Sequence, residues 1–265
     1  MNSFSDFVKG HRPLVCGHRG AKALFPENTS AGFEKAKELR VDLIETDVRL
    51  TKDGHLVIFH DETLDRTTNM TGPVRSFTLD ELKNADAGYR FAREDDFPFR
   101  DRGLGILTLD EMLEACAGFW ISIDMKDNDA EAARTLAGVL EKHNRHDSVL
   151  VGSFHPPVIE YFRKLAPRVA NCASPSDVKR FFVHMFTFTL AFYNPGYECF
   201  QLPVEHRGKF LLSRRIVKAA HSRNIAVIVW TVNDEATIKL LMDMDVDGII
   251  SDNPELLMRV AEERK

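Results

Sequence analysis

The chain has 265 residues, 44% of them hydrophobic, and a formal net charge of −5, which suits one large α/β domain or two small ones. No block of basic residues marks a nucleic-acid track, and no run approaches the roughly 20 apolar residues of a membrane-spanning helix. Any anionic ligand would therefore have to find positive charge locally, in a metal ion or a few placed cations.

The N-terminus has no apolar core of signal-peptide length before charged residues intervene. The cysteines Cys16, Cys116, Cys172 and Cys199 are far apart and form no CxxC pair. That spacing is typical of buried thiols in a reducing compartment rather than of disulfides or a zinc site. We therefore expect a cytoplasmic protein with no nucleic-acid partner.

Short apolar segments alternate with longer amphipathic ones along most of the chain. The expected strands, most of them rich in β-branched residues, are 13–18, 42–50, 120–126, 148–154, 168–173, 199–204, 225–232 and 246–252. The expected helices, whose apolar residues recur every three or four positions, are 30–39, 109–118, 130–144, 156–166, 213–224 and 234–245. Several begin at cap-like residues, such as Thr29 or Ser30, Thr108, and Asn233 or Asp234.

The strands are too continuously apolar to have one wet face, which favours a parallel sheet covered on both sides. Eight such strands with crossovers predict an α/β fold, a (β/α)8 TIM barrel that forms a single domain over residues 1–265. The alternative is an open doubly wound sheet, but no GxGxxG follows the first strand.

Two segments break the rhythm of alternating elements. After a strand extension that ends at His60, the chain from about 61 to 105 predicts a small inserted cap of loops and one short helix, placed after the second strand. The segment 178–200 is unusually aromatic and too short to span a bilayer. We expect a helix packed on the barrel here. The alternative is an apolar lip that meets lipid chains or a membrane surface through residues 180–193.

Three carboxylates fall near the ends of the second and third of these strands, where a barrel places its chemistry. Glu45 and Asp47 are two residues apart and so lie on the same side of their strand, and Asp124 follows on the next strand. Oxygen ligands suit a hard divalent cation, Mg²⁺ or Ca²⁺. The set contains no cysteine and no closely spaced histidine pair, which argues against zinc.

Cations and histidines fall at the same strand ends. Arg19 and Lys126 are of the residue types that hold phosphate oxygens. His18 and His60 can act as general base and general acid near neutral pH. The whole set suits phosphoryl transfer, in which cations stabilise the charge of the transition state while histidines move protons.

At these residues the sequence resembles the glycerophosphodiester phosphodiesterase family. The matching elements run in family order and are "GHRG" and "PENT" within 17–29, "ETDVRLTKDGHLVIFHD" at 45–61, "DMK" at 124–126, "VWTVND" at 229–234 and "DGIISDNP" at 247–254. The first two blocks together are highly specific, and the resemblance covers nearly the whole chain.

The resemblance implies a barrel with an insertion after its second strand, and hydrolysis of a glycerophosphodiester to sn-glycerol 3-phosphate and an alcohol. By position, it makes His18 and His60 the acid–base pair, Arg19 and Lys126 the phosphate-binding residues, and Glu45 and Asp47 ligands of the divalent metal. The family pattern usually has Glu-x-Lys where this chain has Asp124-Met125-Lys126. Because Asp is one methylene shorter, Asp124 could bind the ion directly or through a water.

The family mechanism begins with attack of a neighbouring glycerol hydroxyl on phosphorus, assisted by one histidine, while the other protonates the leaving alcohol. Water then opens the cyclic phosphate with the roles reversed, and the proximity of the internal hydroxyl contributes much of the acceleration. We expect Phe154 and Trp230 to form apolar walls for the glycerol or leaving group, with a core role as the alternative for Trp230. The stretch 26–29 is expected mainly to form the bend and cap of the following helix, with orientation of the catalytic groups as an additional role for Glu27 and Asn28.

Three functions remain to be compared. The leading one is a phosphodiesterase for small water-soluble glycerophosphodiesters such as glycerophosphocholine. The second is a lysophospholipase D, suggested by the aromatic run 181–193, since an acyl chain needs an apolar channel. The third is a non-catalytic binding barrel, which would have lost a general acid or a metal ligand. The sequence favours no particular head group, ion or oligomeric state.

Overall fold

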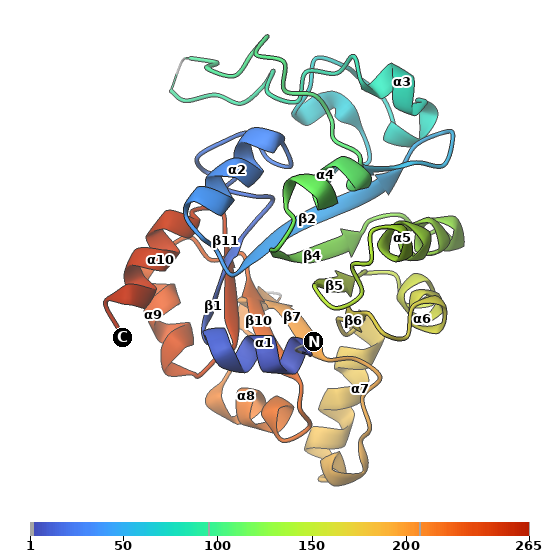
Figure 1. Ribbon diagram of the computed structural model, residues 1–265. Coiled ribbons are helices and arrows are strands. Elements are labelled where there is room, and N and C mark those ends of the chain that lie inside the picture. Colours follow the sequence, from blue (N-terminus) through green and yellow to red (C-terminus); the bar gives the residue numbers. More distant parts are fainter. Residues whose placement is uncertain (1–2, 95, 207, 265) are drawn as a thin grey trace.

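A computed structural model describes residues 3–94, 96–206 and 208–264. Its centre is a ring of parallel strands: β1 (Leu14–Gly17), β2 (Leu43–Leu50), β4 (Trp120–Met125), β5 (Val149–Gly152), β6 (Ala170–Asn171), β7 (Cys199–Pro203), β10 (Ala226–Trp230) and β11 (Gly248–Ser251). Neighbours pair in the order β6-β5-β4-β2-β1-β11-β10-β7. A parallel bridge between Cys172 and Cys199 links the two ends of this order. The predicted (β/α)8 barrel is confirmed (Figure 1).

Helices surround the ring and follow the strands in turn: α2 (Ser30–Glu38), α4 (Leu109–Ala115), α5 (Ala130–Lys142), α6 (Pro156–Leu165), α7 (Pro175–Phe186), α8 (Arg214–His221), α9 (Glu235–Asp243) and α10 (Pro254–Glu262). The side chains of Thr29, Thr108 and Asp234 accept backbone N–H groups in the first turns of α2, α4 and α9, as their cap-like character predicted. The helices α7 and α10 were not among the six predicted segments, although a helix within 178–200 was expected.

A further unpredicted helix, α1 (Phe4–His11), lies across one opening of the ring (Figure 1). Its buried residues Phe4, Phe7 and Val8 pack with inward-facing strand residues such as Leu14 and with the partly buried Trp120. The rings of Phe7 and Trp120 stack with centroids 4.7 Å apart and planes inclined by 16°. The helix therefore closes the end of the barrel at which the strands begin.

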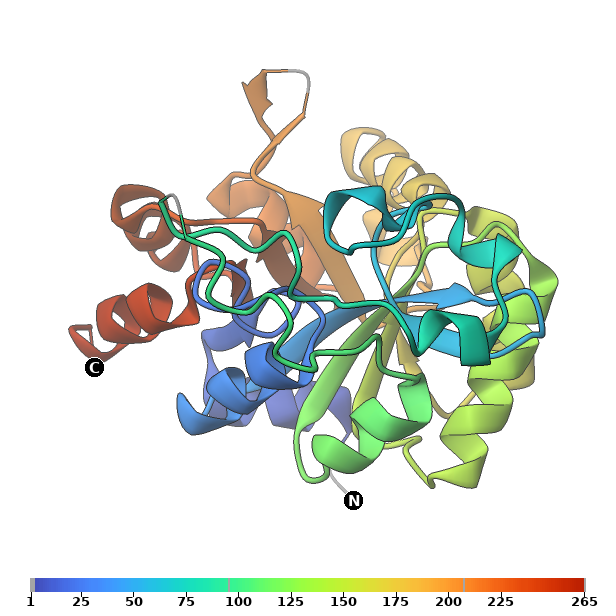
Figure 2. The same ribbon diagram turned by 90° about the horizontal axis from the view of Figure 1, so that it is seen from above.

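The segment between β2 and α4 forms the inserted structure beside the carboxyl end of β2 (Figures 1 and 2). It contains β3 (Leu56–Ile58), which pairs antiparallel with β2, the 3-10 turns η1 (Leu64–Arg66) and η2 (Val74–Ser76), and α3 (Leu79–Leu82). A small core of its own, which includes the buried Leu64 and Leu82, holds the segment together. It therefore has a fixed position from which to place side chains over the barrel.

The aromatic segment forms α7 and the 3-10 turn η3 (Leu190–Phe192), and after β7 a short hairpin of β8 (Glu205–His206) and β9 (Lys209–Phe210) follows. Phe181 is fully buried and meets Phe200 of β7 edge-on, with ring centroids 4.9 Å apart. Phe186, Phe188 and Phe192 are exposed. One face of the segment thus packs on the barrel, as predicted, and another faces outward. Within the described ranges, no helix has the length and apolarity needed to cross a bilayer.

The Phe7–Trp120 stack gives a first prediction, on stability. Phe7→Ala should lower the free energy of unfolding by about 3 kcal/mol, because it leaves a cavity in the plug that closes the barrel. Phe192→Ala is the matched control: Phe192 is 86% exposed, so its loss should change stability by less than about 0.5 kcal/mol. Urea unfolding followed by circular dichroism measures both, and equal values for the two variants would contradict the role of α1 as a plug.

Candidate active site

A cavity of about 760 Å³ opens at the carboxyl ends of the barrel strands. All nine residues predicted to act in catalysis, substrate binding or metal binding line it: His18, Arg19, Glu45, Asp47, His60, Asp124, Lys126, Phe154 and Trp230. The strand ends therefore bring the predicted residues together around one space. This co-location is what the barrel topology predicts for side chains that follow parallel strands.

The first corner of the site is the tight turn after β1. Gly20 has a φ of +88°, and a Cβ there would lie 2.6 Å from the carbonyl carbon of Gly32 in α2, so only glycine allows this approach. Arg19 also has a left-handed backbone, with a φ of +49°, which costs about 1–2 kcal/mol for a residue with a side chain. Its carbonyl accepts the N–H of Asn28 at 3.0 Å, and its own N–H donates to Glu45 at 3.1 Å. These bonds hold the Arg19 backbone in its strained conformation.

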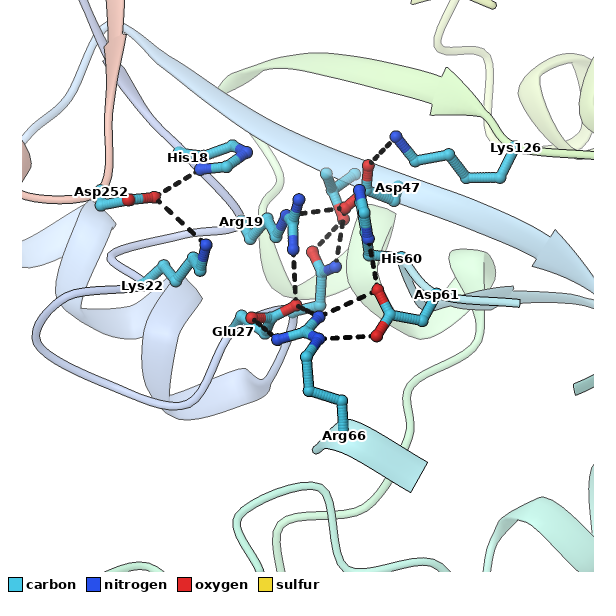
Figure 3. Close-up of polar contacts among 12 residues, drawn as sticks. His18, Arg19, Lys22, Glu27, Asp47, His60, Asp61, Arg66, Lys126 and Asp252 are labelled. Carbon is cyan, nitrogen blue, oxygen red and sulfur yellow. Dashed lines mark hydrogen bonds and ion pairs between the residues drawn. The ribbon is translucent and has the colours of Figure 1, made fainter. Parts of the chain in front are cut away.

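Asp47 is the best-buried charge of the site, with 1% of the residue exposed. Its oxygens lie 2.8 Å from Nζ of Lys126 and 3.2 Å from Nε of Arg19, and they accept the side-chain amide of Asn28 at 3.0 Å (Figure 3). Burial alone would raise the pKa of Asp47, but Lys126 and Arg19 outweigh it and hold that pKa below its ordinary value. Lys126 also binds Asp124 at 2.6 Å, and it thereby joins β2 to β4.

Glu45 is in a different electrostatic situation from Asp47. Burial, together with the nearby Asp47 carboxylate, raises the pKa of Glu45 to about 7. Burial likewise raises the pKa of Asp124. Two carboxylates with raised pKa values beside a third are the kind of donor set that a hard divalent cation neutralises, so the residues present fit Mg²⁺ or Ca²⁺ by chemistry. In the part of the chain that the structure describes, however, no three His, Cys, Asp or Glu side chains form a ready-made metal cluster.

Each of the two histidines is held by a carboxylate. Nδ1 of His18 lies 2.5 Å from Asp252, and Nδ1 of His60 lies 2.6 Å from Asp61. A carboxylate accepts, so each Nδ1 carries the proton and each Nε2 is left to act in the cavity. Nε2 of His18 lies 3.8 Å from Glu45. Burial lowers the pKa of His60, against the pull of Asp47 and Asp61.

A second layer of charge lies behind the cavity. Glu27 accepts the guanidinium of Arg19 at 2.7 Å, so the expectation that Glu27 and Asn28 orient neighbouring groups agrees with their contacts. Arg66, from η1, binds both Glu27 and Asp61 (Figure 3). The two residues that hold Arg19 and His60 are therefore themselves joined by one side chain.

The opposite side of the cavity is apolar. Phe154 is 56% exposed and meets Trp230 edge-on, with centroids 5.9 Å apart and planes inclined by 84°. Val178 and Phe182 of α7 continue this wall. Trp230 also packs against the buried residues inside the ring, which agrees with the core role considered for it, while its contact with a substrate stays a prediction. The cavity thus has one charged side and one apolar side.

Residues 18–256 match the model of the glycerophosphoryl diester phosphodiesterase family. The chain belongs to this family. It is 33% identical over 258 residues to a glycerophosphodiester phosphodiesterase of Bacillus altitudinis. The aligned region covers 95% of this chain and 99% of that relative. A second glycerophosphodiester phosphodiesterase, from Caldanaerobacter subterraneus subsp. tengcongensis, is 32% identical, with coverages of 94% and 98%.

Solved structures agree with this assignment to the glycerophosphoryl diester phosphodiesterase family. A phosphodiesterase of Oleispira antarctica in complex with the product sn-glycerol-3-phosphate superposes with a TM-score of 0.80 at 26% identity, and the match covers 96% of this chain and 99% of that one. A glycerophosphodiester phosphodiesterase of Agrobacterium tumefaciens gives 0.73 at 28% identity, over 93% and 98%. The family and the enzyme class inferred from the sequence are confirmed.

The sequence analysis assigned no role to three charged residues that support the site, Asp61, Asp252 and Arg66. Asp61 directly follows His60, and Asp252 directly follows β11, the last strand of the barrel, so adjacency and barrel closure could have indicated both. Arg66 lies in the inserted segment, which has no periodic pattern, and no sequence signal indicated that its side chain would reach Glu27.

Proposed function

We propose that the protein hydrolyses small glycerophosphodiesters to sn-glycerol 3-phosphate and an alcohol, by acid–base catalysis from His18 and His60. The observation that carries this proposal is one cavity with two carboxylate-held histidines beside Arg19 and Lys126. The names of the relatives, and the product bound to the Oleispira antarctica enzyme, support the same substrate class.

The histidines suit proton transfer in both directions. In the proposed first step, one Nε2 removes the proton of the glycerol hydroxyl next to the phosphodiester, and this oxygen attacks phosphorus. The other histidine, which begins this step protonated on both ring nitrogens, gives its Nε2 proton to the leaving alcohol, and water then opens the cyclic phosphate with the roles exchanged. Asp252 and Asp61 fix the ring orientation and stabilise the positive charge that forms on each imidazole.

The charge on the phosphate is met by Arg19 and Lys126. Arg19 offers a planar fork of N–H donors, and Lys126 a point charge whose pKa is raised by Asp124 and Asp47 although burial opposes this. Both cations are held in place before substrate arrives, so their stabilisation of the transition state requires little reorganisation. Glu45, Asp47 and Asp124 would hold Mg²⁺ or Ca²⁺, which when bound supplies further positive charge at the phosphate oxygens.

The substrate class follows from the two sides of the cavity. The charged side suits the glycerophosphate group, and the wall of Phe154 and Trp230 suits the leaving alcohol. The relatives carry the names of glycerophosphodiester phosphodiesterases, so a lysophospholipase D activity is not favoured. The apolar wall nevertheless makes a lysophospholipid the right competing substrate in an assay.

A membrane contact is a separate part of the proposal. Val183, Phe186, Phe188 and Phe192 are all more than half exposed, and Phe182 connects them to the cavity wall through its stacking on Phe186. The segment 174–222 carries seven lysines and arginines against three acidic residues, although the chain as a whole is negative. Exposed aromatic rings in a segment whose sequence has an excess of positive charge fit an anionic lipid surface.

The histidine roles give a second prediction. His18→Ala and His60→Ala should each lower kcat on glycerophosphocholine by at least ~10²-fold, because each removes one proton carrier. The matched control is His143→Ala, since His143 is also partly buried and paired with a carboxylate, Asp110, but does not line the cavity. Retention of activity by either cavity variant would show that the assigned roles are wrong.

A third prediction concerns substrate and metal. Purified protein should hydrolyse glycerophosphocholine faster than lysophosphatidylcholine at equal concentration, because the product class of the relatives lacks an acyl chain. Chelation should abolish turnover, and Mg²⁺ or Ca²⁺ should restore it, since three carboxylates of the cavity would hold the ion. Choline release measures both. Undiminished turnover after chelation would contradict the metal proposal alone, and faster release from the lysophospholipid would reverse the substrate order.

A fourth prediction tests the membrane contact. Wild-type protein should float with vesicles that contain phosphatidylglycerol and much less with vesicles of phosphatidylcholine alone. The double variant Phe188→Ser/Phe192→Ser should lower the bound fraction by at least ~10-fold, because it removes two exposed rings. Leu240→Ser is the control: Leu240 is 43% exposed but lies on α9. Failure of the wild type to float, or equal binding of the double variant, would overturn the contact.

A further inference from the structure

The inserted segment contributes one side chain, that of Arg66, which binds both carboxylates that hold Arg19 and His60. Arg66 donates to the two oxygens of Glu27 at 2.7 and 2.8 Å, and to the two oxygens of Asp61 at 2.6 and 3.1 Å. It therefore forms a two-pronged contact with each carboxylate. In Figure 3 Glu27 and Asp61 lie between Arg66 and the catalytic groups.

The contacts continue from the carboxylates to the cavity. Glu27 accepts the guanidinium of Arg19 at 2.7 Å, and Asp61 holds Nδ1 of His60 at 2.6 Å. Arg19, which is predicted to bind phosphate, is thus joined to Arg66 through one carboxylate. His60, which is predicted to move a proton, is joined to Arg66 through another. A movement of Arg66 would release both carboxylates at once.

The backbone of Arg66 is anchored well enough to serve this purpose. Its neighbour Leu64 is fully buried in the core of the inserted segment, and the carbonyl of Leu64 accepts both the N–H and the hydroxyl of the buried Thr68, at 3.1 and 2.9 Å. The Arg66 side chain itself is 47% exposed. Because an exposed ion pair contributes little to stability, the four hydrogen bonds of Arg66 matter more for orientation than for folding.

We propose that Arg66 is a positioning residue, which orients Arg19 through Glu27 and His60 through Asp61. The inference rests on the proposed function, because it assigns Arg66 to the same site. A planar guanidinium can fork onto two carboxylates together, whereas an ammonium presents one point of charge. The requirement at position 66 is therefore for the shape of the guanidinium as well as for its charge.

Arg66 has two contacts, the Glu27 arm and the Asp61 arm, and we expect them to contribute differently to the kinetics. Loss of the Glu27 arm loosens a residue that holds phosphate, so Glu27→Gln should mainly raise KM. Loss of the Asp61 arm loosens a proton carrier, so Asp61→Asn should mainly lower kcat. Arg66→Ala should do both, with a loss in kcat/KM of roughly 10- to 10²-fold, the size expected when a catalytic group is displaced by about 1 Å.

Arg75 offers a matched control in the same inserted segment. Its side chain is 43% exposed, close to the value for Arg66, and it binds the carbonyl of Thr51 and the carboxylates of Asp129 and Glu131. None of these partners is among the described residues that line the cavity. Arg75→Ala therefore removes a comparable set of contacts without touching the support of the site.

The test measures kcat and KM on glycerophosphocholine for the wild type, Arg66→Ala, Arg66→Lys and Arg75→Ala, together with their thermal unfolding midpoints. We expect Arg66→Lys to resemble Arg66→Ala, Arg75→Ala to resemble the wild type, and the midpoints of the two alanine variants to shift by similar small amounts. Added guanidinium ion, at concentrations that leave the wild type unaffected, should restore part of the kcat of Arg66→Ala.

If the wild type is active, either of two outcomes overturns the inference. One is that Arg66→Ala hydrolyses glycerophosphocholine as fast as Arg75→Ala, and the other is that Arg66→Lys keeps full activity. A wild type that does not hydrolyse the substrate overturns the proposed function instead. In that case, calorimetric titration with sn-glycerol 3-phosphate still tests Arg66 through Arg19, since Arg66→Ala should weaken binding and Arg75→Ala should not. Equal binding by both variants would then reject the positioning role.

Discussion

The arrangement of the site depends on the burial of one carboxylate, Asp47. A lone charge at a position 1% exposed would cost several kcal/mol, so Asp47 requires close partners. They come from three places: Arg19 from the turn after β1, Asn28 from the residues before α2, and Lys126 from the end of β4. Satisfying one buried group thus fixes the relative positions of three loops, and the strained backbone of Arg19 is part of the result.

The barrel and the inner ring of the site could be predicted from the sequence because both follow simple periodicities. Continuous apolar strands separated by amphipathic helices indicate a parallel barrel, and its strands all end at one face. His18 and Lys126 could therefore be placed together although 108 positions separate them, and the two-residue period put Glu45 and Asp47 on the same side. None of these inferences required knowledge of a side-chain contact.

The remaining features could not be predicted because they depend on contacts without a local pattern. The helix α1 is short, and its stacking partner Trp120 lies far along the chain, so nothing near the N-terminus indicates that it plugs the barrel. Arg66 reaches Glu27 across 39 positions because the buried Leu64 fixes η1 over the site. The destination of such a side chain is decided by the packing of the insertion.

The division of the cavity into a charged and an apolar side has a consequence for the proposed chemistry. With substrate in the cavity, the rings of Phe154 and Trp230 would leave less room for water near Arg19 and Lys126, and a charge interaction strengthens as the surrounding dielectric falls. In the proposed function, the wall that would contact the leaving alcohol would therefore also strengthen the hold of the cations on the phosphate. Substitutions in the wall should for this reason affect catalysis as well as specificity, because the two effects share the same apolar surface.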